Sequence, residues 1–324
     1  MCGYEATSGN AYIGGGVVKE RNLKRRKAGE EYSPKTMFHV VIGLNLLLGV
    51  FRLVSAEQLQ INGPECGLSA PSKRIVNGKA AQEDQFPWMV FLKVFFPGQA
   101  TRCGGSIITK RHVLTAGHCT LLNDEEALKI DVIYGSNDIH KGTTLRAMKM
   151  IRHPEFDAAK FLHDIAILLV DNEFVYGNNA KPICVPSAPV NIFNSDVVVA
   201  GWGFLSQDGQ AVDYLRYTVV KVVPNARCAD KFQHTGYRQD LMYCAYRLNT
   251  DACQGDSGGP MMTRIEDGRY LQVGIVSYGI GCALDDMPGV YARLEALVPW
   301  LMEFIGAYDR YRDLNMEDIP PPSK

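Results

Sequence analysis

Residues 251–260 have the sequence Asp-Ala-Cys-Gln-Gly-Asp-Ser-Gly-Gly-Pro, a turn of small residues around one serine. Glycines at this density let backbone N–H groups point toward a reacting atom instead of joining a strand ladder. A serine hydroxyl is a weak nucleophile unless an imidazole takes its proton and an acid holds that imidazole in place. The stretch around Ser257 therefore directs the search toward histidines and acids elsewhere in the chain.

Two other segments supply those groups. Residues 115–119 have the sequence Thr-Ala-Gly-His-Cys and place His118 at the end of an expected strand. Asp164 directly precedes the apolar run 165–168, where a carboxylate must be exposed or hydrogen-bonded. Taken singly, such a histidine is more often structural than catalytic. Together with Ser257, the two residues make up the set that nucleophilic catalysis by a hydroxyl requires.

The apolar pattern of residues 75–311 predicts a β-rich fold. Its apolar runs are short and are separated by Gly and Pro, as in 89–96, 165–170, 197–200 and 271–278. Short strands with turn signals favour sandwiches or barrels over parallel βαβ units, which need helical patterns between the strands. One helix is expected near the end, where apolar residues recur at i, i+3, i+4 and i+7 from Leu294 to Tyr308.

These segments agree in order and spacing with a known family. Together with Gly-Trp-Gly at 201–203 and Val-Ser-Tyr-Gly at 276–279, they resemble the trypsin-like serine proteases of the chymotrypsin family. The resemblance covers residues 75–311. It implies an all-β fold of two six-stranded antiparallel Greek-key β-barrels followed by a C-terminal α-helix. It also implies a serine endopeptidase that needs no cofactor.

The resemblance assigns the catalytic roles residue by residue. It makes His118 the general base, Asp164 the acid that orients it, and Ser257 the nucleophile. The backbone N–H groups of Gly255 and Ser257 are expected to form the oxyanion hole. The alternative is a catalytically silent homologue that acts as a binding or adaptor protein. One departure from many relatives is Gly117 in place of alanine, which we interpret as added backbone freedom beside His118.

The primary specificity pocket is also implied by the resemblance. Asp251, six residues before Ser257, corresponds to the pocket floor, and Gly279 and Gly289 correspond to open walls, with Ser277 in the same substrate-binding segment. A carboxylate at the base of an open slot attracts a long cation by roughly 4 kcal/mol at about 4 Å and an effective dielectric near 20. Cleavage after Arg or Lys is therefore expected.

The segment before the body resembles the activation site of the family. Lys73-Arg74 stands directly ahead of Ile75, and cleavage after Arg74 frees an α-ammonium group on Ile75. By resemblance this group pairs with Asp256 and orders the oxyanion loop, so the protein is expected to be made as a zymogen. The expected partners are substrates with Arg or Lys before the scissile bond, an activating trypsin-like protease, and serpin or Kunitz-type inhibitors.

The N-terminal part divides by composition. Residues 1–36 form a polar, basic extension, and residues 37–56 contain an apolar run typical of a signal peptide, with cleavage expected after Ala56. An uncleaved signal anchor, which would bring the enzyme to a membrane, is the alternative. Residues 57–74 are the expected activation peptide and 312–324 a disordered tail. The chain is thus expected to be secreted, with type II membrane anchoring as the alternative.

Composition and cysteine content agree with an extracellular protein. A net charge of -1 and 46% hydrophobic residues argue against nucleic-acid binding and against disorder. Eight of the nine cysteines allow 105 pairings, among which the sequence alone does not choose. The family resemblance suggests Cys66–Cys184, Cys103–Cys119, Cys228–Cys244 and Cys253–Cys282, and leaves Cys2 before the signal segment. The histidines lack the usual spacing for zinc, so no metal is expected.

Overall fold

The computed structural model describes residues 61–70, 79–204, 209–232, 234–248, 255–279 and 286–311, the last range with side chains as far as Tyr308. The chain divides into two units, Met1–Glu57 and Gln58–Lys324, and every described residue belongs to the second. The expected N-terminal extension, the signal segment, the bond after Arg74 and the tail 312–324 lie outside the described residues.

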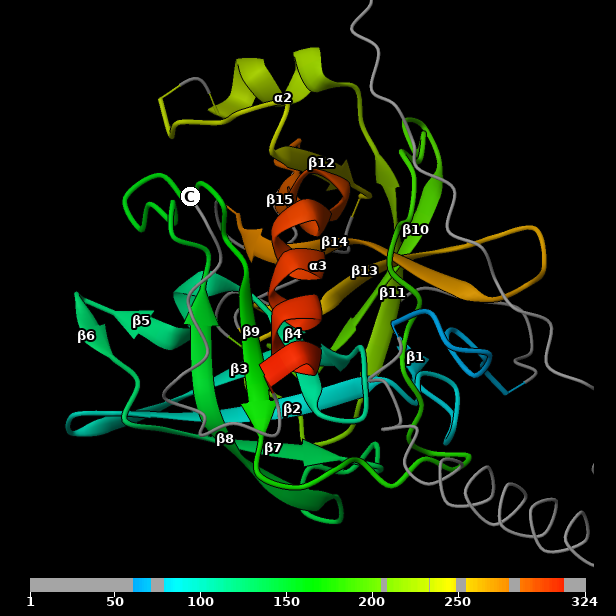
Figure 1. The fold of residues 1–324 in the computed structure, drawn as a ribbon. Coiled ribbons are helices and arrows are strands. Elements are labelled where there is room, and N and C mark those ends of the chain that lie inside the picture. The colour runs from blue at the N-terminus through cyan, green and yellow to red at the C-terminus, as the bar shows by residue number, and fades with distance from the viewer. Residues whose placement is uncertain are drawn as a thin grey trace, which may run out of the picture. The chain divides into compact units, whose positions relative to one another are not determined.

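Six strands of the first half close into an antiparallel barrel in the order β2-β3-β4-β9-β8-β7 (Figure 1). They are β2 (Met89–Phe96), β3 (Gln99–Ile107), β4 (His112–Thr115), β7 (Lys129–Tyr134), β8 (Thr143–Arg152) and β9 (Ala166–Val170). In β7 every second side chain is buried, as the two-residue period of a strand with one face on the core requires. In β9 all five residues are buried, which explains its uninterrupted apolar sequence.

A second ring of strands follows in the order β11-β10-β13-β14-β15-β12, and the pairing of β11 with β12 closes it. The strands are β10 (Asp196–Gly201), β11 (Arg216–Val222), β12 (Met242–Tyr246), β13 (Pro260–Arg264), β14 (Tyr270–Tyr278) and β15 (Gly289–Arg293). The short strand β1 (Lys79–Ala80) adds to β11. The remaining hairpin joins β5 (Leu121–Leu122) to β6 (Glu125–Glu126) beside the first barrel.

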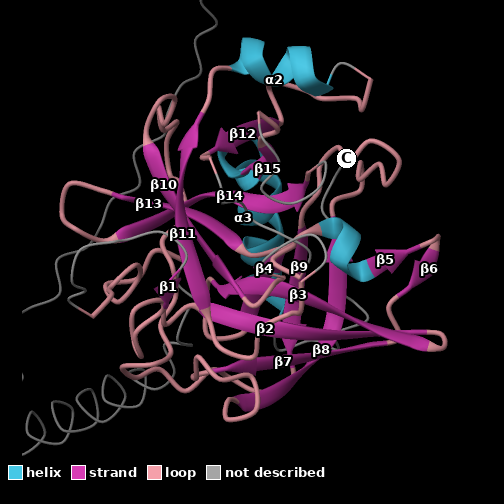
Figure 2. Cartoon of the chain, turned by 180° about the vertical axis from the view of Figure 1, so that it is seen from behind, coloured by secondary structure: helices cyan, strands magenta, loops and turns pink. Residues whose placement is uncertain are grey.

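Three helices complete the described elements: η1 (Gly117–Thr120), α2 (Asn225–Phe232) and α3 (Leu294–Tyr311). Strands dominate the molecule, as Figure 2 shows. Helix α3 packs against β14 of the second barrel. It also reaches β4 of the first barrel, because the rings of Phe304 and Tyr308 contact the His112 ring. The last helix therefore contacts strands of both barrels.

The expected two-barrel fold with a C-terminal helix is confirmed. The predicted apolar runs coincide with β2, β9, β10 and β14, and the predicted terminal helix is α3. Helix α2 was not expected from the sequence. It buries only Cys228 and Phe232 out of eight residues, so it lacks the apolar repeat by which a helix is recognised.

Candidate active site

His118 and Asp164 meet because two neighbouring strands of the first barrel deliver them. Strand β4 leads into η1, which carries His118, and Asp164 lies two residues before β9; β4 and β9 are paired, with Thr115 opposite Ala166. The Nδ1 atom of His118 lies 2.8 Å from Oδ2 of Asp164. The backbone N–H of His118 donates to the other carboxylate oxygen at 2.9 Å. The two contacts fix both the position and the orientation of the ring.

The carboxylate of Asp164 is completely buried and has a third partner. The hydroxyl of Ser277, on β14, donates to Oδ2 of Asp164 at 2.5 Å. Burial raises the pKa of Asp164, but the His118 charge and the hydrogen bonds from His118 and Ser277 reverse this effect and leave the pKa lowered. Asp164 is therefore an anion held in a site without access to water.

The pKa of His118 depends on its burial and on its contact with Asp164. Burial lowers the pKa of its imidazole, but the negative charge and the hydrogen bond of Asp164 outweigh burial and raise this pKa above its ordinary value of 6.5. Because Nδ1 is engaged by Asp164, the Nε2 edge of the ring is the one left to exchange a proton with a substrate or nucleophile.

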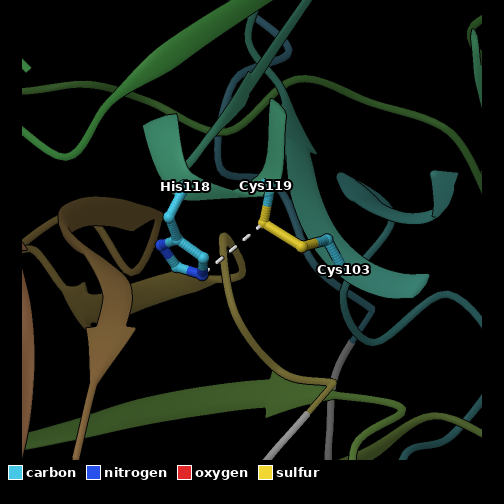
Figure 3. Close-up of side chains that lie close together, drawn as sticks. All are labelled: Cys103, His118 and Cys119. Carbon is cyan, nitrogen blue, oxygen red and sulfur yellow. Dashed lines mark hydrogen bonds between the residues drawn. A yellow bond between two sulfur atoms is a disulfide. The ribbon is translucent and has the colours of Figure 1, made fainter. Parts of the chain in front are cut away.

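The sulfur of Cys119 contacts both the Nε2 edge of His118 and the backbone of Ser257. Nε2 of His118 is 3.9 Å from Sγ of Cys119 (Figure 3). The same sulfur is 3.6 Å from the carbonyl oxygen of Ser257. The backbone N–H of Gly104, on β3, donates to that carbonyl at 2.7 Å. The serine turn of the second barrel is thus attached to the first barrel next to the histidine.

Cysteine pairs brace this arrangement. Cys103 and Cys119 form a disulfide beside His118. Cys66–Cys184 and Cys228–Cys244 are also bonded, so three of the four pairs expected by resemblance are present among the described residues. The fourth, Cys253–Cys282, lies outside them. Although Cys103, Cys119 and His118 group closely, the disulfide leaves no thiolate there to bind a metal.

The serine turn needs its glycines for conformational reasons. Gly255 has φ 93°, and a Cβ atom built on it would lie 3.0 Å from Cα of Gly203. Gly258 has φ 80°, and a Cβ atom there would overlap Oγ1 of Thr115. Both positions lie in the left-handed region that side chains with a Cβ rarely adopt. The turn can therefore lie close to the Gly-Trp-Gly segment on one side and to β4 on the other.

Asp256 points into the Gly-Trp-Gly segment. The backbone N–H of Gly203 donates to Oδ1 of Asp256 at 2.8 Å. A Cβ atom on Gly203 would lie 2.6 Å from the Asp256 carboxylate, and one on Gly201 would overlap it. The two glycines thus make the space that this carboxylate occupies, which gives a physical reason for the Gly-Trp-Gly sequence.

The expected specificity pocket is partly described. Gly279 follows β14 and Gly289 begins β15, and the pairing of Tyr278 with Val290 brings the two glycines near each other. The side chain of Ser277 is turned toward Asp164. Asp251, the expected pocket floor, lies outside the described residues, as do Arg74 and Ile75 of the expected activation site.

A chain of aromatic rings extends from His118 to helix α2 of the second half. The ring of Phe161 makes an edge contact with the His118 ring at a centroid distance of 5.5 Å. Phe161 also packs on Tyr278 at 5.0 Å, and Tyr278 contacts Phe232 of α2 at 5.8 Å. The ring of Phe161 therefore lies between the histidine and Tyr278 of the second barrel.

Glycine is required at position 117 for a steric reason that was not expected from the sequence. A Cβ atom on it would lie 2.9 Å from Cδ2 of Phe156. Gly117 is not among the described glycines with a positive φ, so the backbone freedom expected for it is not used. Glycine at this position gives room to the Phe156 ring, which packs against η1. The one sequence feature that pointed to this contact was Phe156 itself, an aromatic residue in the loop ahead of Asp164.

The pairing of Asp164 with Ser277 was also missed. Ser277 was expected only in the substrate-binding segment, and its Oγ atom also donates a hydrogen bond to the buried carboxylate of Asp164.

As for membrane contact, the described helices include none with the length and apolar character needed to span a bilayer.

Comparison with known proteins gives this geometry a context. A family model described as Trypsin matches residues 75–301. The chain is 32% identical over 276 residues to serine proteinase stubble of Drosophila melanogaster, covering 80% of this chain and 34% of that protein. It is 35% identical over 258 residues to the clotting factor G beta subunit of Tachypleus tridentatus, covering 75% of this chain and 83% of that protein.

A third relative is the venom serine protease Bi-VSP of Bombus ignitus. It is 34% identical over 271 residues, which make up 78% of this chain and 74% of the relative. The chain therefore spans about a third of the length of the Drosophila protein, and most of the length of the other two.

Proposed function

The chain belongs to the trypsin family of serine proteases, and from this premise we propose that it is an endopeptidase with Ser257 as nucleophile, His118 as general base and Asp164 as the orienting acid. The observation that carries the proposal is the two-point contact between His118 and Asp164, at 2.8 and 2.9 Å, which engages Nδ1 and leaves Nε2 as the nitrogen available to exchange a proton. Since the matched region covers only part of some relatives, the activity of the whole protein is part of the proposal.

The reaction follows from these positions. Oγ of Ser257 forms a bond to the scissile carbonyl carbon while its proton passes to Nε2 of His118. The backbone N–H groups of Gly255 and Ser257 stabilise the resulting oxyanion, each such donor being worth about 2.7–4 kcal/mol. His118 then gives its proton to the leaving amine as the C–N bond breaks. Water repeats the sequence on the acyl-enzyme and restores Ser257.

Selectivity for Arg or Lys is proposed from the pocket residues. Asp251 lies six residues before Ser257, in the family's position for the pocket floor. Gly279 and Gly289 place no side chain along the pocket walls. A carboxylate below an open slot favours a long cationic side chain, because the charge is paired where water is scarce.

Zymogen control is proposed from Arg74, Ile75 and Asp256. Cleavage after Arg74 would create the α-ammonium group of Ile75, and pairing with Asp256 would order the oxyanion loop. The space that Gly201 and Gly203 leave for the Asp256 carboxylate supports this role. The Cys66–Cys184 disulfide would keep the activation peptide, residues 57–74, attached to the peptidase domain, residues 75–311.

Secretion is proposed on two grounds. Three disulfides form among the described residues, and stable disulfides are typical of oxidising compartments. The apolar segment 37–56 is suited to a signal peptide, with an uncleaved anchor as the alternative. The partners proposed for the secreted enzyme are protein substrates, an activating trypsin-like protease, and serpin or Kunitz-type inhibitors.

Peptide-library profiling of the full chain, cleaved after Arg74, tests the selectivity. We expect hydrolysis almost only after Arg and Lys. Asp251→Ser should remove this preference and retain slow hydrolysis after other residues, whereas Asp157→Asn, a change on an exposed loop, should leave the profile unaltered. Equal hydrolysis after apolar residues by the unaltered protein would contradict the proposed pocket. Absence of all hydrolysis after complete cleavage would favour the binding or adaptor protein.

A further inference from the structure

A closed loop connects β8 to the start of β9 and ends beside the active site. The backbone N–H of His153 donates to the carbonyl of Ile165 at 3.1 Å, and that of Asp157 donates to the carbonyl of Leu162 at 3.1 Å. These bonds hold the two ends of the loop together. As a result, His153 and His163, ten positions apart, stack ring on ring with centroids 4.6 Å apart and planes 9° apart.

Glu155 adds a carboxylate to the two imidazoles. One ligand atom from each of His153, Glu155 and His163 lies within 4.8 Å of the other two. The carboxylate is largely exposed, with 69% of the Glu155 side chain accessible, and 21% of the His163 side chain is accessible. A cation can therefore reach the group from solvent.

The hydrogen bonding of His163 favours a cation between its Nε2 atom and the Glu155 carboxylate. Its Nδ1 lies 3.1 Å from the carbonyl oxygen of Glu155, and because a carbonyl only accepts, Nδ1 carries the proton. In the neutral ring the lone pair is then on Nε2, which lies 3.4 Å from the carboxylate oxygen Oε2 of Glu155. Two acceptors facing each other repel unless a proton or a metal ion lies between them.

We propose that His153, Glu155 and His163 form a binding site for a divalent transition-metal ion, with Zn²⁺ as the ion of best fit. Two imidazole nitrogens and one carboxylate oxygen suit zinc, whereas Ca²⁺ and Mg²⁺ prefer oxygen ligands alone. The carbonyl of Glu155 already holds the Nδ1 proton of His163, which is the outer contact that fixes a metal-binding imidazole. The fourth position of the ion is left to water.

Binding requires a small rearrangement. Ligands at about 2.0–2.1 Å from a tetrahedral zinc lie about 3.3 Å from one another, so atoms spread over 4.8 Å must move closer. The nearly parallel rings must also turn toward each other for both lone pairs to reach one ion. The ion would displace the 3.2 Å hydrogen bond that Nδ1 of His153 now accepts from the backbone N–H of Glu155.

The rearrangement has a consequence for catalysis, which rests on the proposed peptidase activity. His163 is bonded to Asp164 through the peptide chain, and the same loop carries Phe161, whose ring contacts His118. In the structure described, His118 and Asp164 already hold a 2.8 Å contact. Movement of His163 toward a metal ion would shift the adjoining Asp164 and Phe161, which contact His118, and we therefore expect the bound ion to lower the rate of hydrolysis.

Metal binding is measured on the full, uncleaved chain, so the result does not depend on activity. The chain is freed of metal with a chelator, the chelator is removed, and Co²⁺ is added while the visible spectrum is recorded. We expect one Co²⁺ per chain with the intense absorption of a four-coordinate ion, and its displacement by one Zn²⁺ but not by Mg²⁺. Calorimetric titration with Zn²⁺ gives the affinity.

Variants locate the ion. His153→Gln, Glu155→Gln and His163→Gln should each weaken Zn²⁺ binding at least tenfold, whereas His234→Gln, at an exposed histidine outside the loop, should bind as the unaltered chain does. Glu155→Gln decides the case if a histidine variant fails to fold, because Glu155 is at the surface. No Co²⁺ spectrum, or unchanged binding by Glu155→Gln, would overturn the site.

Hydrolysis by the chain cleaved after Arg74 tests the consequence separately. Zn²⁺ should reduce the initial rate of the unaltered enzyme and of His234→Gln, and Glu155→Gln should need at least tenfold more Zn²⁺ for the same inhibition. Equal inhibition of Glu155→Gln would mean that zinc acts elsewhere. Binding without inhibition would refute the regulatory consequence alone. An inactive enzyme would count against the proposed peptidase and leave the binding result standing.

Discussion

Asp164 controls the protonation of His118, and this control has a measurable pH signature. The neutral imidazole is the proposed base, and Asp164 raises its pKa above 6.5, so kcat/KM should fall as pH decreases through that raised value. In Asp164→Asn the charge is lost and burial remains, which lowers the pKa of His118. The acidic limb should therefore move to lower pH, with kcat reduced by about 10⁴-fold.

The pH profile of Asp157→Asn provides the matched control. Asp157 is in the loop that precedes Asp164, and its side chain accepts hydrogen bonds from the backbone N–H groups of Ala159 and Lys160 and lies 3.8 Å from Nζ of Lys160. Its profile should match that of the unaltered enzyme. An acidic limb that stayed in place in Asp164→Asn would contradict the assigned role of the carboxylate.

Gly117 is the residue whose replacement tests the packing behind the histidine. Gly117→Ala would place a methyl group 2.9 Å from Cδ2 of Phe156. We expect a loss of about 1–3 kcal/mol in the free energy of unfolding, the usual cost of overpacking, and a lower kcat because η1 carries His118. Urea unfolding and steady-state rates measure both effects.

A second substitution should reverse these losses. Gly117→Ala combined with Phe156→Leu removes the ring edge that the methyl group meets, so stability and kcat should recover in part. A Gly117→Ala protein as stable and as active as the unaltered chain would show that Phe156 moves away at no cost.

Single residues differ in how far sequence could predict them. The expected partners His118 and Asp164 lie together because each follows or precedes an apolar run that becomes one of two paired strands. Ser277 could not be assigned to Asp164, since the two are 113 positions apart and belong to different barrels. The stacking of His153 on His163 was not expected, because a separation of ten positions matches no common metal-binding spacing and only the closed loop brings the two rings together.

Helix α3 contacts β4 through the buried ring of His112. His112 is fully buried, and its ring meets Tyr308 at 4.8 Å, while Nδ1 contacts Oγ1 of Thr109 at 2.8 Å. No described residue offers a hydrogen-bond partner to its Nε2. Burial and the charge of Arg111 lower the pKa of His112 from 6.5 to about 3. The His112 ring is therefore neutral when it packs against α3.

The direction of the pH effect follows from that pKa. Between pH 6.5 and about 3 the unfolded chain binds a proton at His112 that the folded chain does not, so the free energy of unfolding falls as pH decreases, by up to about 1.4 kcal/mol for each pH unit. In His112→Phe this part of the slope should vanish, as urea unfolding at several pH values would show. An unchanged slope would mean that other groups cause the acid sensitivity.

The elements themselves were predictable where burial repeats along the chain. Strands β2 and β9 and helix α3 bury one face or all of their residues, so their apolar patterns reveal them. Helix α2 does not, because it covers the second barrel with only two buried side chains. The tight hairpin of β5 and β6 has no buried residues to mark it.

At the scale of the whole molecule, the site exists because the two barrels meet through specific polar contacts. Gly104 of β3 binds the carbonyl of Ser257, and Oγ of Ser106 on the same strand donates to Oε1 of Gln272 on β14 at 2.6 Å. Local sequence patterns predict strands but not which barrel faces which. Only the resemblance to a known family predicted that arrangement, and with it the positions of the site residues in each barrel.

Labelling of Ser257 tests the proposed nucleophile most directly. The full chain is cut after Arg74, treated with an organofluorophosphonate, and analysed by mass spectrometry of its peptides. We predict one adduct per chain, on Ser257, with much slower labelling of the uncut chain and none of His118→Ala. No adduct on Ser257 after complete cleavage, or an equal rate in His118→Ala, would contradict catalysis by a serine that His118 activates.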